Sequence, residues 1–344
     1  MFDFFVIGAG LSGSTLAWRL INGGYKIKVF DKPKLNISSN IAGGIINPLT
    51  GKRTALTWKA HDIFDELHKF YPETENKTGI SFFKLMPTYK LFESRFEQNE
   101  WLNKSAEKNY NCFFENIPEY LDQSKINNPF GSLLIKETAK LDVKKYLNTL
   151  HNFLLNQNSI EFCMVENLKI GNNSVTFNGE KAKAVIYCDG TFATQNHYFS
   201  YLPHKPVHGE VLEVEIENFY NDRMINKGIF IIPQYKNKYI VGSTYNWNIK
   251  ETVTTQNGRD ELEKKLFNLI KLPFKIVNHF AGIRPSTNDR RPFLGKHPGY
   301  ENVFIFGGMG SKGVSLVPYL SKVFINYISG KGKIPSECDI SRIK

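Results

Sequence analysis

The sequence predicts an α/β fold, with a Rossmann-like nucleotide-binding domain and an interleaved, mainly antiparallel α+β second domain. Three observations support this prediction: a strand–glycine–helix–strand unit at the N-terminus, a strand–glycine–helix unit near the C-terminus, and alternating strand patterns between them. The 344 residues, 41% of them hydrophobic, are enough for two domains or one large elaborated domain.

The N-terminal unit opens with a short apolar run over 2–7, which suits a buried strand. The run leads directly into the turn Gly8-Ala9-Gly10-Leu11-Ser12-Gly13, followed by a predicted helix over 14–22 and a strand over 25–30. Asp31 ends that strand, 18 residues after the last glycine of the turn. This order is typical of a dinucleotide-binding βαβ unit.

The residues of this unit have separate physical roles. Gly8 permits the tight turn, Gly10 lets the backbone approach a pyrophosphate, and Gly13 lets the helix pack closely on the sheet. The helix start directs its N–H groups and positive dipole end at the phosphates. Asp31 can accept hydrogen bonds from a ribose diol and would repel a 2′-phosphate, which argues against NADP. An ordinary glycine loop is the alternative.

Hydrophobic periodicity predicts the remaining elements. Helices are predicted over 57–71, 141–155, 260–270 and from the second glycine turn to 328. Strands are predicted over 160–164, 174–177, 184–187, 207–216, 228–233, 239–243 and 302–306. The strand over 184–187 ends in Cys188-Asp189-Gly190, a further strand-to-turn crossing.

These elements divide the chain into interleaved segments. The nucleotide-binding domain is predicted over 1–75, 135–205 and 276–344, and the second, substrate-binding domain over 76–134 and 206–275. A simple NAD dehydrogenase more often has a contiguous nucleotide unit, so the interleaving favours a flavoprotein.

Charge and cysteine usage narrow the function classes. The net charge is +11, which indicates either an anionic partner or, as we favour, an evenly lysine-rich composition. The four cysteines are scattered without metal-site spacing, so we expect free thiols and no metal. Without a long apolar stretch or a signal-peptide pattern, we expect a cytoplasmic protein with no membrane partner.

The stretch Ala281 to Gly295, read with the glycine turn Gly307 to Gly313, resembles the D-amino-acid oxidase family of FAD enzymes, which includes glycine oxidase and sarcosine oxidase. Further pieces of the resemblance are the N-terminal βαβ unit, Ala42-Gly43-Gly44, His208-Gly209-Glu210-Val211, Val241-Gly242 and Gly282-Ile283-Arg284-Pro285. Together these pieces cover nearly the whole chain, and their order is more specific than any one of them.

The resemblance implies an FAD-dependent oxidoreductase that oxidises the C–N bond of a small amino acid or secondary amine. A hydride passes to flavin N5, the imine hydrolyses, and oxygen or another acceptor reoxidises the flavin. Arg284 resembles the arginine that binds the substrate carboxylate in amine-oxidising relatives. A structural arginine at the domain interface is the alternative. Lys312 would place positive charge beside the reduced flavin or assist oxygen reduction, and a solvated surface lysine is its alternative.

Two departures from the family pattern stand out. Sarcosine oxidases hold their flavin through a cysteine near the arginine motif, whereas residues 282–289 contain none, so we expect non-covalent FAD. Asp189 stands where the family usually has a small residue. Tyr245, Phe230 and Trp247 are candidate pocket aromatics, with core packing as the alternative.

The residues predicted to bind the cofactor are Gly8, Gly10, Leu11, Ser12, Gly13, Asp31, Lys32, Ser39, Asn40, Ala42, Gly43, Gly44, Val165, Cys188, Asp189, Gly190, Met309, Gly310, Ser311, Lys312, Gly313 and Val314. The residues predicted to bind the substrate are Arg284, Tyr245 and Phe230, and Arg284 and Lys312 are the candidate catalytic residues.

Two other functions stay open. Gly310-Ser311-Lys312-Gly313 resembles the turn of a tRNA-modifying flavoenzyme that trims a carboxymethylaminomethyl wobble uridine, although we expect no methyltransferase portion in this chain. Lysines clustered at the pocket mouth would favour that RNA substrate, and an even spread a small molecule. The third alternative is a non-catalytic flavin-binding protein. The substrate, the electron acceptor and the oligomeric state are left open.

Overall fold

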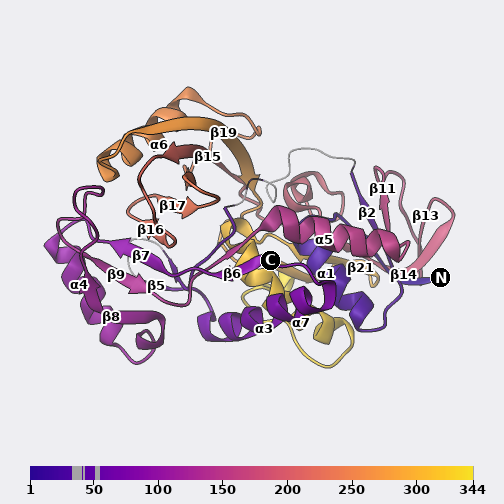
Figure 1. Cartoon of the computed structure of the whole chain (residues 1–344). Coiled ribbons are helices and arrows are strands. Elements are labelled where there is room, and N and C mark those ends of the chain that lie inside the picture. The colour runs from indigo at the N-terminus through magenta and orange to yellow at the C-terminus, as the bar shows by residue number, and fades with distance from the viewer. Residues whose placement is uncertain (33–40, 42, 51–54, 344) are drawn as a thin grey trace.

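Two large sheets lie side by side in the computed structural model, which describes residues 1–32, 41, 43–50 and 55–343 (Figure 1). The sheet on the right of Figure 1 contains the N-terminal strands, and the sheet on the left contains the antiparallel strands of the chain's middle.

The first sheet has the strand order β11-β2-β1-β14-β13-β12, with β21 paired to β14 and β20 to β21. Its central pairs, from β11 to β21, are parallel, because β1 pairs in that sense with both β2 and β14. The strands are β1 (Phe2–Ile7), β2 (Ile27–Asp31), β11 (Ile160–Phe162), β12 (Lys169–Ile170), β13 (Val175–Phe177), β14 (Glu180–Tyr187), β20 (Phe293–Lys296) and β21 (Val303–Gly307). Parallel strands are buried on both faces, which explains the continuous apolar run of β1.

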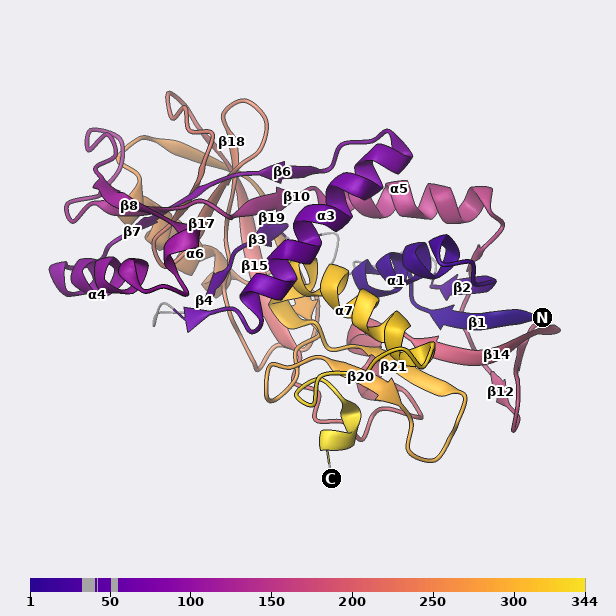
Figure 2. The same ribbon diagram turned by 90° about the horizontal axis from the view of Figure 1, so that it is seen from below.

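Helices cover one face of this sheet, and Figure 2 shows several of them side by side. Helix α1 (Leu11–Asn22) packs between α5 (Val143–Asn156) and α7 (Gly313–Ile328), and α3 (Ala60–Thr78) packs on α7. Leu16, Leu20 and Leu320 are fully buried in the core formed there. This packing fixes the starts of α1 and α7 against the sheet edge.

The second sheet has the order β19-β15-β18-β17-β16-β7-β9-β8 and is antiparallel except for the β16–β7 pair. Its strands are β7 (Thr88–Leu91), β8 (Phe114–Glu119), β9 (Ser132–Ile135), β15 (Val207–Ile216), β16 (Met224–Asn226), β17 (Phe230–Pro233), β18 (Lys238–Gly242) and β19 (Phe274–Arg284). Helix α6 (Gln256–Leu269) packs on β15, and α4 (Arg95–Ala106) packs on β8 and β9. Leu262 and Leu266 of α6 are fully buried against this sheet.

Short elements connect the two sheets. Strand β10 (Ala139–Leu141) pairs with β3 (Ile45–Ile46) and β6 (Phe83–Leu85), and β4 (Leu49–Thr50) pairs with β5 (Ala55–Leu56). The 3-10 turns are η1 (Asn111–Phe113), η2 (Gly190–Gln195), η3 (Gly310–Lys312) and η4 (Ile340–Arg342).

The predicted elements are present, with shifted ends. The helix predicted over 57–71 spans Ala60–Thr78 and continues through Pro72. The backbone N–H groups of Phe82 and Phe83 donate to the Glu75 carboxylate, at 2.5 and 2.6 Å, and this tie anchors the helix beyond the proline. The predicted domain boundary between 275 and 276 falls inside β19, which pairs with β15 along its length. The division into domains stays a prediction.

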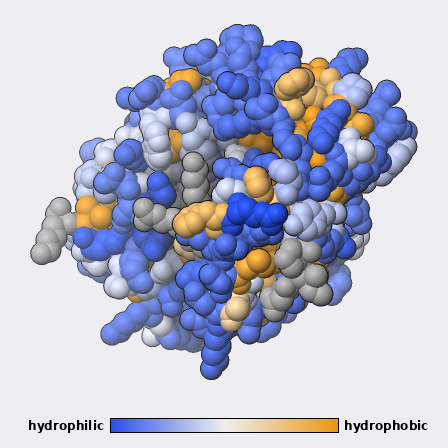
Figure 3. All heavy atoms as spheres, turned by 90° about the vertical axis from the view of Figure 1, so that its left-hand side faces the viewer, coloured by the Kyte–Doolittle hydropathy of each residue, from blue (hydrophilic) through white to orange (hydrophobic). Residues whose placement is uncertain are grey.

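The side of the molecule that faces the viewer in Figure 3, where the second sheet lies, is mostly hydrophilic, with hydrophobic residues in small separate groups. No helix in the described part of the chain is long and apolar enough to cross a bilayer.

Candidate functional site

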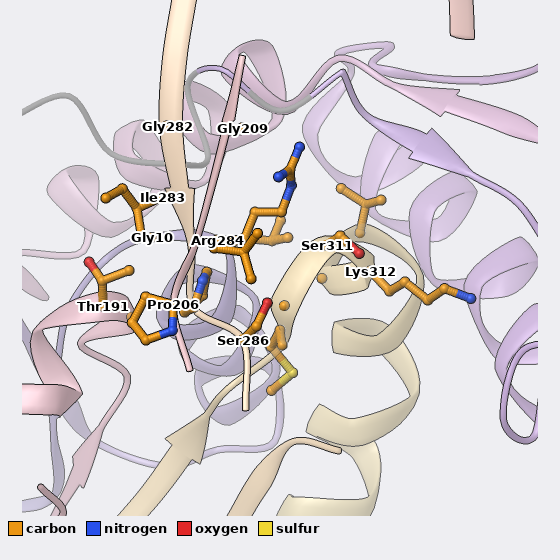
Figure 4. Close-up of a pocket in the computed structure, with 18 of the residues that line it drawn as sticks. Gly10, Thr191, Pro206, Gly209, Gly282, Ile283, Arg284, Ser286, Ser311 and Lys312 are labelled. Carbon is orange, nitrogen blue, oxygen red and sulfur yellow. The ribbon is translucent and has the colours of Figure 1, made fainter. Parts of the chain in front are cut away.

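A single continuous cavity of about 2680 Å³ is lined by both sheets. Ligand pockets for small molecules are typically about 300–1,000 Å³, so this cavity is large enough for a dinucleotide together with a second ligand. Every described residue that was predicted to bind cofactor or substrate lines it, except Gly13. Ser39, Asn40 and Ala42 lie outside the described residues. Figure 4 shows part of this cavity, with residues of both sheets turned toward it.

The β1–α1 turn forms one wall of the cavity. Gly8 has φ +101°, and a Cβ there would lie 2.6 Å from the Cys188 carbonyl oxygen. Gly13 packs against the turn instead of facing the cavity, because a Cβ there would lie 1.8 Å from the Gly8 carbonyl oxygen. Gly10 is the N-cap of α1 and supplies no side-chain cap, so the helix start presents backbone N–H groups toward the cavity.

Asp31 stands at the carboxyl end of β2, on the cavity wall. Burial raises the pKa of its carboxyl group, and a hydrogen bond from the Ala9 backbone partly opposes that shift. An acceptor held at this place fits a ribose diol, which donates two hydrogen bonds. The adjacent Lys32 ammonium lies 3.8 Å from the centre of the Phe192 ring.

Asp189 faces the same cavity from the end of β14, between Cys188 and Gly190. Burial raises its pKa to about 6, while a 2.8 Å hydrogen bond from the Asn196 side-chain amide acts in the opposite direction. Val165 also lines the cavity. The carboxyl edge of the parallel sheet is therefore built from β1, β2 and β14 together, as open α/β sheets build nucleotide sites.

The second glycine turn, Met309 to Val314, lies against the first. A Cβ on Gly313 would lie 2.9 Å from the Leu11 side chain, so the starts of α1 and α7 approach each other closely. Gly310 has φ +59°, a conformation that glycine adopts without strain. Helix α7 has no side-chain N-cap either. Two helix N-termini thus point toward the same cavity, an arrangement suited to an anionic cofactor.

Lys312 also lines the cavity but does not point toward Arg284; in Figure 4 its side chain extends away from that residue. Its ammonium donates to the Thr57 hydroxyl at 2.6 Å. Burial, together with the neighbouring Arg291 charge, lowers the pKa of Lys312 to about 7. The lysine is therefore enclosed and partnered, unlike the solvated surface lysine considered from the sequence.

Arg284 is the last residue of β19, and its side chain crosses the neighbouring strand β15 at Gly209. The position next to it must be glycine, because a Cβ on Gly209 would lie 2.1 Å from the guanidinium. The guanidinium donates to the Ser243 hydroxyl at 2.7 Å and to the carbonyl oxygens of His208 and Thr244 at 3.3 Å.

The acceptors of Arg284 are all neutral oxygens, and burial lowers its pKa. The described residues give this guanidinium no carboxylate partner within ion-pair distance. Its guanidinium carbon lies 4.3 Å from the centre of the Tyr245 ring. A cation held in this way in a cavity wall is a binding point for an anion.

Two of the predicted pocket aromatics are poorly packed. Tyr245 is 56% exposed and Trp247 is 42% exposed, which excludes core packing as the reason for their presence. Phe230 lines the cavity too, but it also packs against the buried Met86, Met224 and Ile232. Core packing therefore accounts for part of its role.

Further groups that line the cavity were not predicted. Thr57 and Ser243 hold Lys312 and Arg284, and Arg291 adds a positive charge beside Lys312. Nothing in the sequence signals Thr57, which lies 255 residues from Lys312. Ser243 directly follows the Val241-Gly242 pair that already carried part of the resemblance.

Gly44 also lines the cavity, with φ +66°. It packs so closely on β10 that a Cβ there would lie 1.9 Å from the Leu141 carbonyl oxygen.

The described residues contain no cluster of acids, histidines and cysteines able to hold a metal ion. Burial raises the pKa of Cys188 well above its usual range and that of Cys163 to about 11, so both thiols near the cavity are protonated.

The model of the DAO family, described as FAD dependent oxidoreductase, matches residues 3–326. Glycine oxidase of Pseudomonas putida is 28% identical over 134 residues, which are 38% of this chain and 36% of that protein. The tRNA 5-methylaminomethyl-2-thiouridine biosynthesis bifunctional protein MnmC of Legionella pneumophila is 20% identical over an alignment of 366 residues, with 91% of this chain and 52% of that protein covered. These alignments span about a third and about half of the relatives' own length.

Among solved structures, iminodiacetate oxidase from Chelativorans sp. BNC1 has the same fold, with a TM-score of 0.82 at 15% sequence identity. The superposition covers 98% of this chain and 99% of that chain.

Proposed function

The chain belongs to the DAO family of FAD dependent oxidoreductases, and on that premise we propose that it oxidises the C–N bond of a small amino acid or secondary amine. The observation that carries this proposal is the Arg284 guanidinium, which faces a cofactor-sized cavity without a carboxylate partner among the described residues. The relatives named glycine oxidase support a substrate of the glycine type.

FAD is the cofactor, and the residues present fit it. The glycine turn of β1–α1 and the α1 start would hold the pyrophosphate, Asp31 the ribose, and the start of α7 the anionic side of the reduced ring system. The chemistry that FAD supplies when bound is acceptance of the hydride from the carbon next to the amine. Residues 282–289, around Arg284, contain no cysteine, and non-covalent binding stays a prediction.

In this proposal Arg284 binds the substrate carboxylate through its planar fork. The Ser243 hydroxyl and the two backbone carbonyls hold the guanidinium in one orientation, so the amine and its α-carbon take a defined position. Burial of the charge strengthens the attraction for an anion, because fewer water molecules screen it.

The test is anaerobic mixing of the purified FAD-loaded protein with glycine, sarcosine, alanine and the carboxylate-free amines methylamine and dimethylamine. We expect loss of the oxidised flavin absorbance with at least one carboxylate-bearing amine, and much slower loss with the carboxylate-free amines. A purified protein that takes up no FAD, or FAD that no amine bleaches, refutes the proposal.

A second candidate, oxidation of a carboxymethylaminomethyl wobble uridine in tRNA, is supported by the similarity to MnmC over 91% of the chain. The described cavity lining contains nine Lys or Arg and six Asp or Glu, a ratio of 1.5. The whole chain has 44 and 33, a ratio of about 1.3, so basic residues are hardly enriched among the described residues of the cavity lining. This spread favours the small molecule.

A gel-shift titration with bulk tRNA between 50 and 200 mM salt separates the two candidates. A tRNA substrate predicts a shift that weakens steeply with salt, because the contacts release counterions from phosphates. A small-molecule enzyme with a net charge of +11 gives at most a non-specific shift at low salt, whereas a tRNA substrate is still shifted at 200 mM salt.

A further inference from the structure

The segment after β18 forms an aromatic wall beside Arg284, which we define as Tyr245 and Trp247. Asn246 exchanges two backbone hydrogen bonds with His208 of β15, at 2.9 and 3.0 Å. Alternate residues of an extended segment point to the same side. The cavity lining follows that alternation, since it includes Tyr245 and Trp247 but not Asn246.

The two rings of the aromatic wall lie open in the cavity. Tyr239, which precedes them in the same region of the chain, is only 1% exposed, whereas Tyr245 and Trp247 are about half exposed. Large exposed apolar groups in a concave site mark a binding surface. The wall therefore presents apolar contact area to the cavity next to the proposed carboxylate site.

A cation lies beside each ring of the aromatic wall. The Arg284 guanidinium carbon lies 4.3 Å from the Tyr245 ring centre, and the Lys205 ammonium lies 4.9 Å from the Trp247 ring centre. Lys205 is held in place by its backbone N–H, which donates to the Ser286 carbonyl oxygen at 2.8 Å.

We propose that the substrate is a secondary amino acid whose N-substituent carries a planar ring, and that this ring lies on the aromatic wall. The inference rests on the proposed function, because it places the substrate carboxylate on Arg284. A planar ring is the group that two flat aromatic faces recognise best, since stacked and edge-to-face contacts add to the area that is buried. Trp247 is then a specificity-determining residue.

The test compares three probes with the FAD-loaded protein: sarcosine, N-benzylglycine and N-(cyclohexylmethyl)glycine. The last two differ in ring planarity at nearly equal size. Kd is measured from the perturbation of the flavin spectrum and kcat/KM from flavin bleaching. We expect N-benzylglycine to exceed N-(cyclohexylmethyl)glycine about 5- to 100-fold in affinity and in kcat/KM.

In the Trp247→Leu variant this preference should fall by about 2- to 10-fold, because only the Tyr245 ring of the wall remains. Trp247→Phe keeps a flat ring and should retain most of the preference. The matched control is Tyr235→Leu, because Tyr235 is 73% exposed and has Lys236 5.3 Å from its ring centre, but lies outside the described cavity lining.

Equal Kd and kcat/KM for the planar and non-planar probes would overturn the inference. A preference that Trp247→Leu leaves unchanged would overturn it too. If sarcosine bleaches the flavin in these cases, the proposed function stands without it. If none of the three probes binds or bleaches the flavin, the inference fails, and the proposed function fails with it unless glycine or alanine bleaches the flavin.

Discussion

Replacement of Arg284 by alanine tests the site most directly. The variant removes the charge-assisted hydrogen bonds to a substrate carboxylate, which contribute about 1.5–3 kcal/mol. At about 1.4 kcal/mol per tenfold, kcat/KM for a carboxylate-bearing substrate should fall about 10- to 150-fold. Arg284→Lys keeps the charge without the planar fork, so we expect an intermediate loss. The assay is the anaerobic rate of flavin bleaching as a function of substrate concentration.

The control for this experiment is Arg223→Ala. Arg223 also lies over a tyrosine ring, with 5.1 Å from its guanidinium carbon to the Tyr89 ring centre, but it is not part of the described cavity lining. Its rates should match those of the wild type. The decisive comparison uses a carboxylate-free amine, for which Arg284→Ala should cost little. An equal loss for amines with and without a carboxylate would refute the assigned role.

Two further predictions concern the cofactor site and its charge. Gly13→Ala should lower the free energy of unfolding in urea by about 3 kcal/mol or more and weaken FAD retention, because the new Cβ meets the Gly8 carbonyl. Gly179→Ala, where φ is +79° but the surroundings are open, should cost only about 1 kcal/mol; equal losses would contradict the packing argument. Because the folded-state pKa of Lys312 is about 7 and the ordinary value is 10.5, the unfolded chain binds more protons between these values, and stability should rise with pH across that window. Lys312→Met should flatten this rise in urea denaturation curves, and parallel curves for the two proteins would show that the lysine is not buried as described.

Local patterns led to the residues at the carboxyl edge of the first sheet, and these residues line the cavity. The turn from Gly8 to Gly13 and Asp31 are contiguous with the strands and helix that position them, so periodicity and glycine spacing reveal them. The same reasoning applied to the second glycine turn, because it too follows directly on a buried strand. Sequence patterns are informative here because the neighbours of these residues in space are also their neighbours in the chain.

The substrate half depends on contacts between distant segments. The partners of Arg284 come from β15 and from the segment after β18, 76 to 40 residues earlier in the chain, and no local signal couples them. The enclosure of Lys312 depends likewise on Thr57 and Arg291. Helix ends were also displaced, since the tie between Glu75 and Phe82 holds α3 beyond a proline that sequence patterns treat as a stop.

The strand order of the first sheet determines when its parts can pair during synthesis on the ribosome. Phe4 of β1 pairs with Ala184 of β14, 180 residues later, and Val185 pairs in turn with Val303 of β21. At about 5–20 residues per second, β1 waits roughly 10–40 s for its central neighbour after it has been synthesised. Until then the edge of β1 that later pairs with β14 is unpaired and accessible to other chains and to chaperones. The glycine turn between β1 and α1 is thus synthesised first, but its wall of the cavity is complete only after β14 has been added.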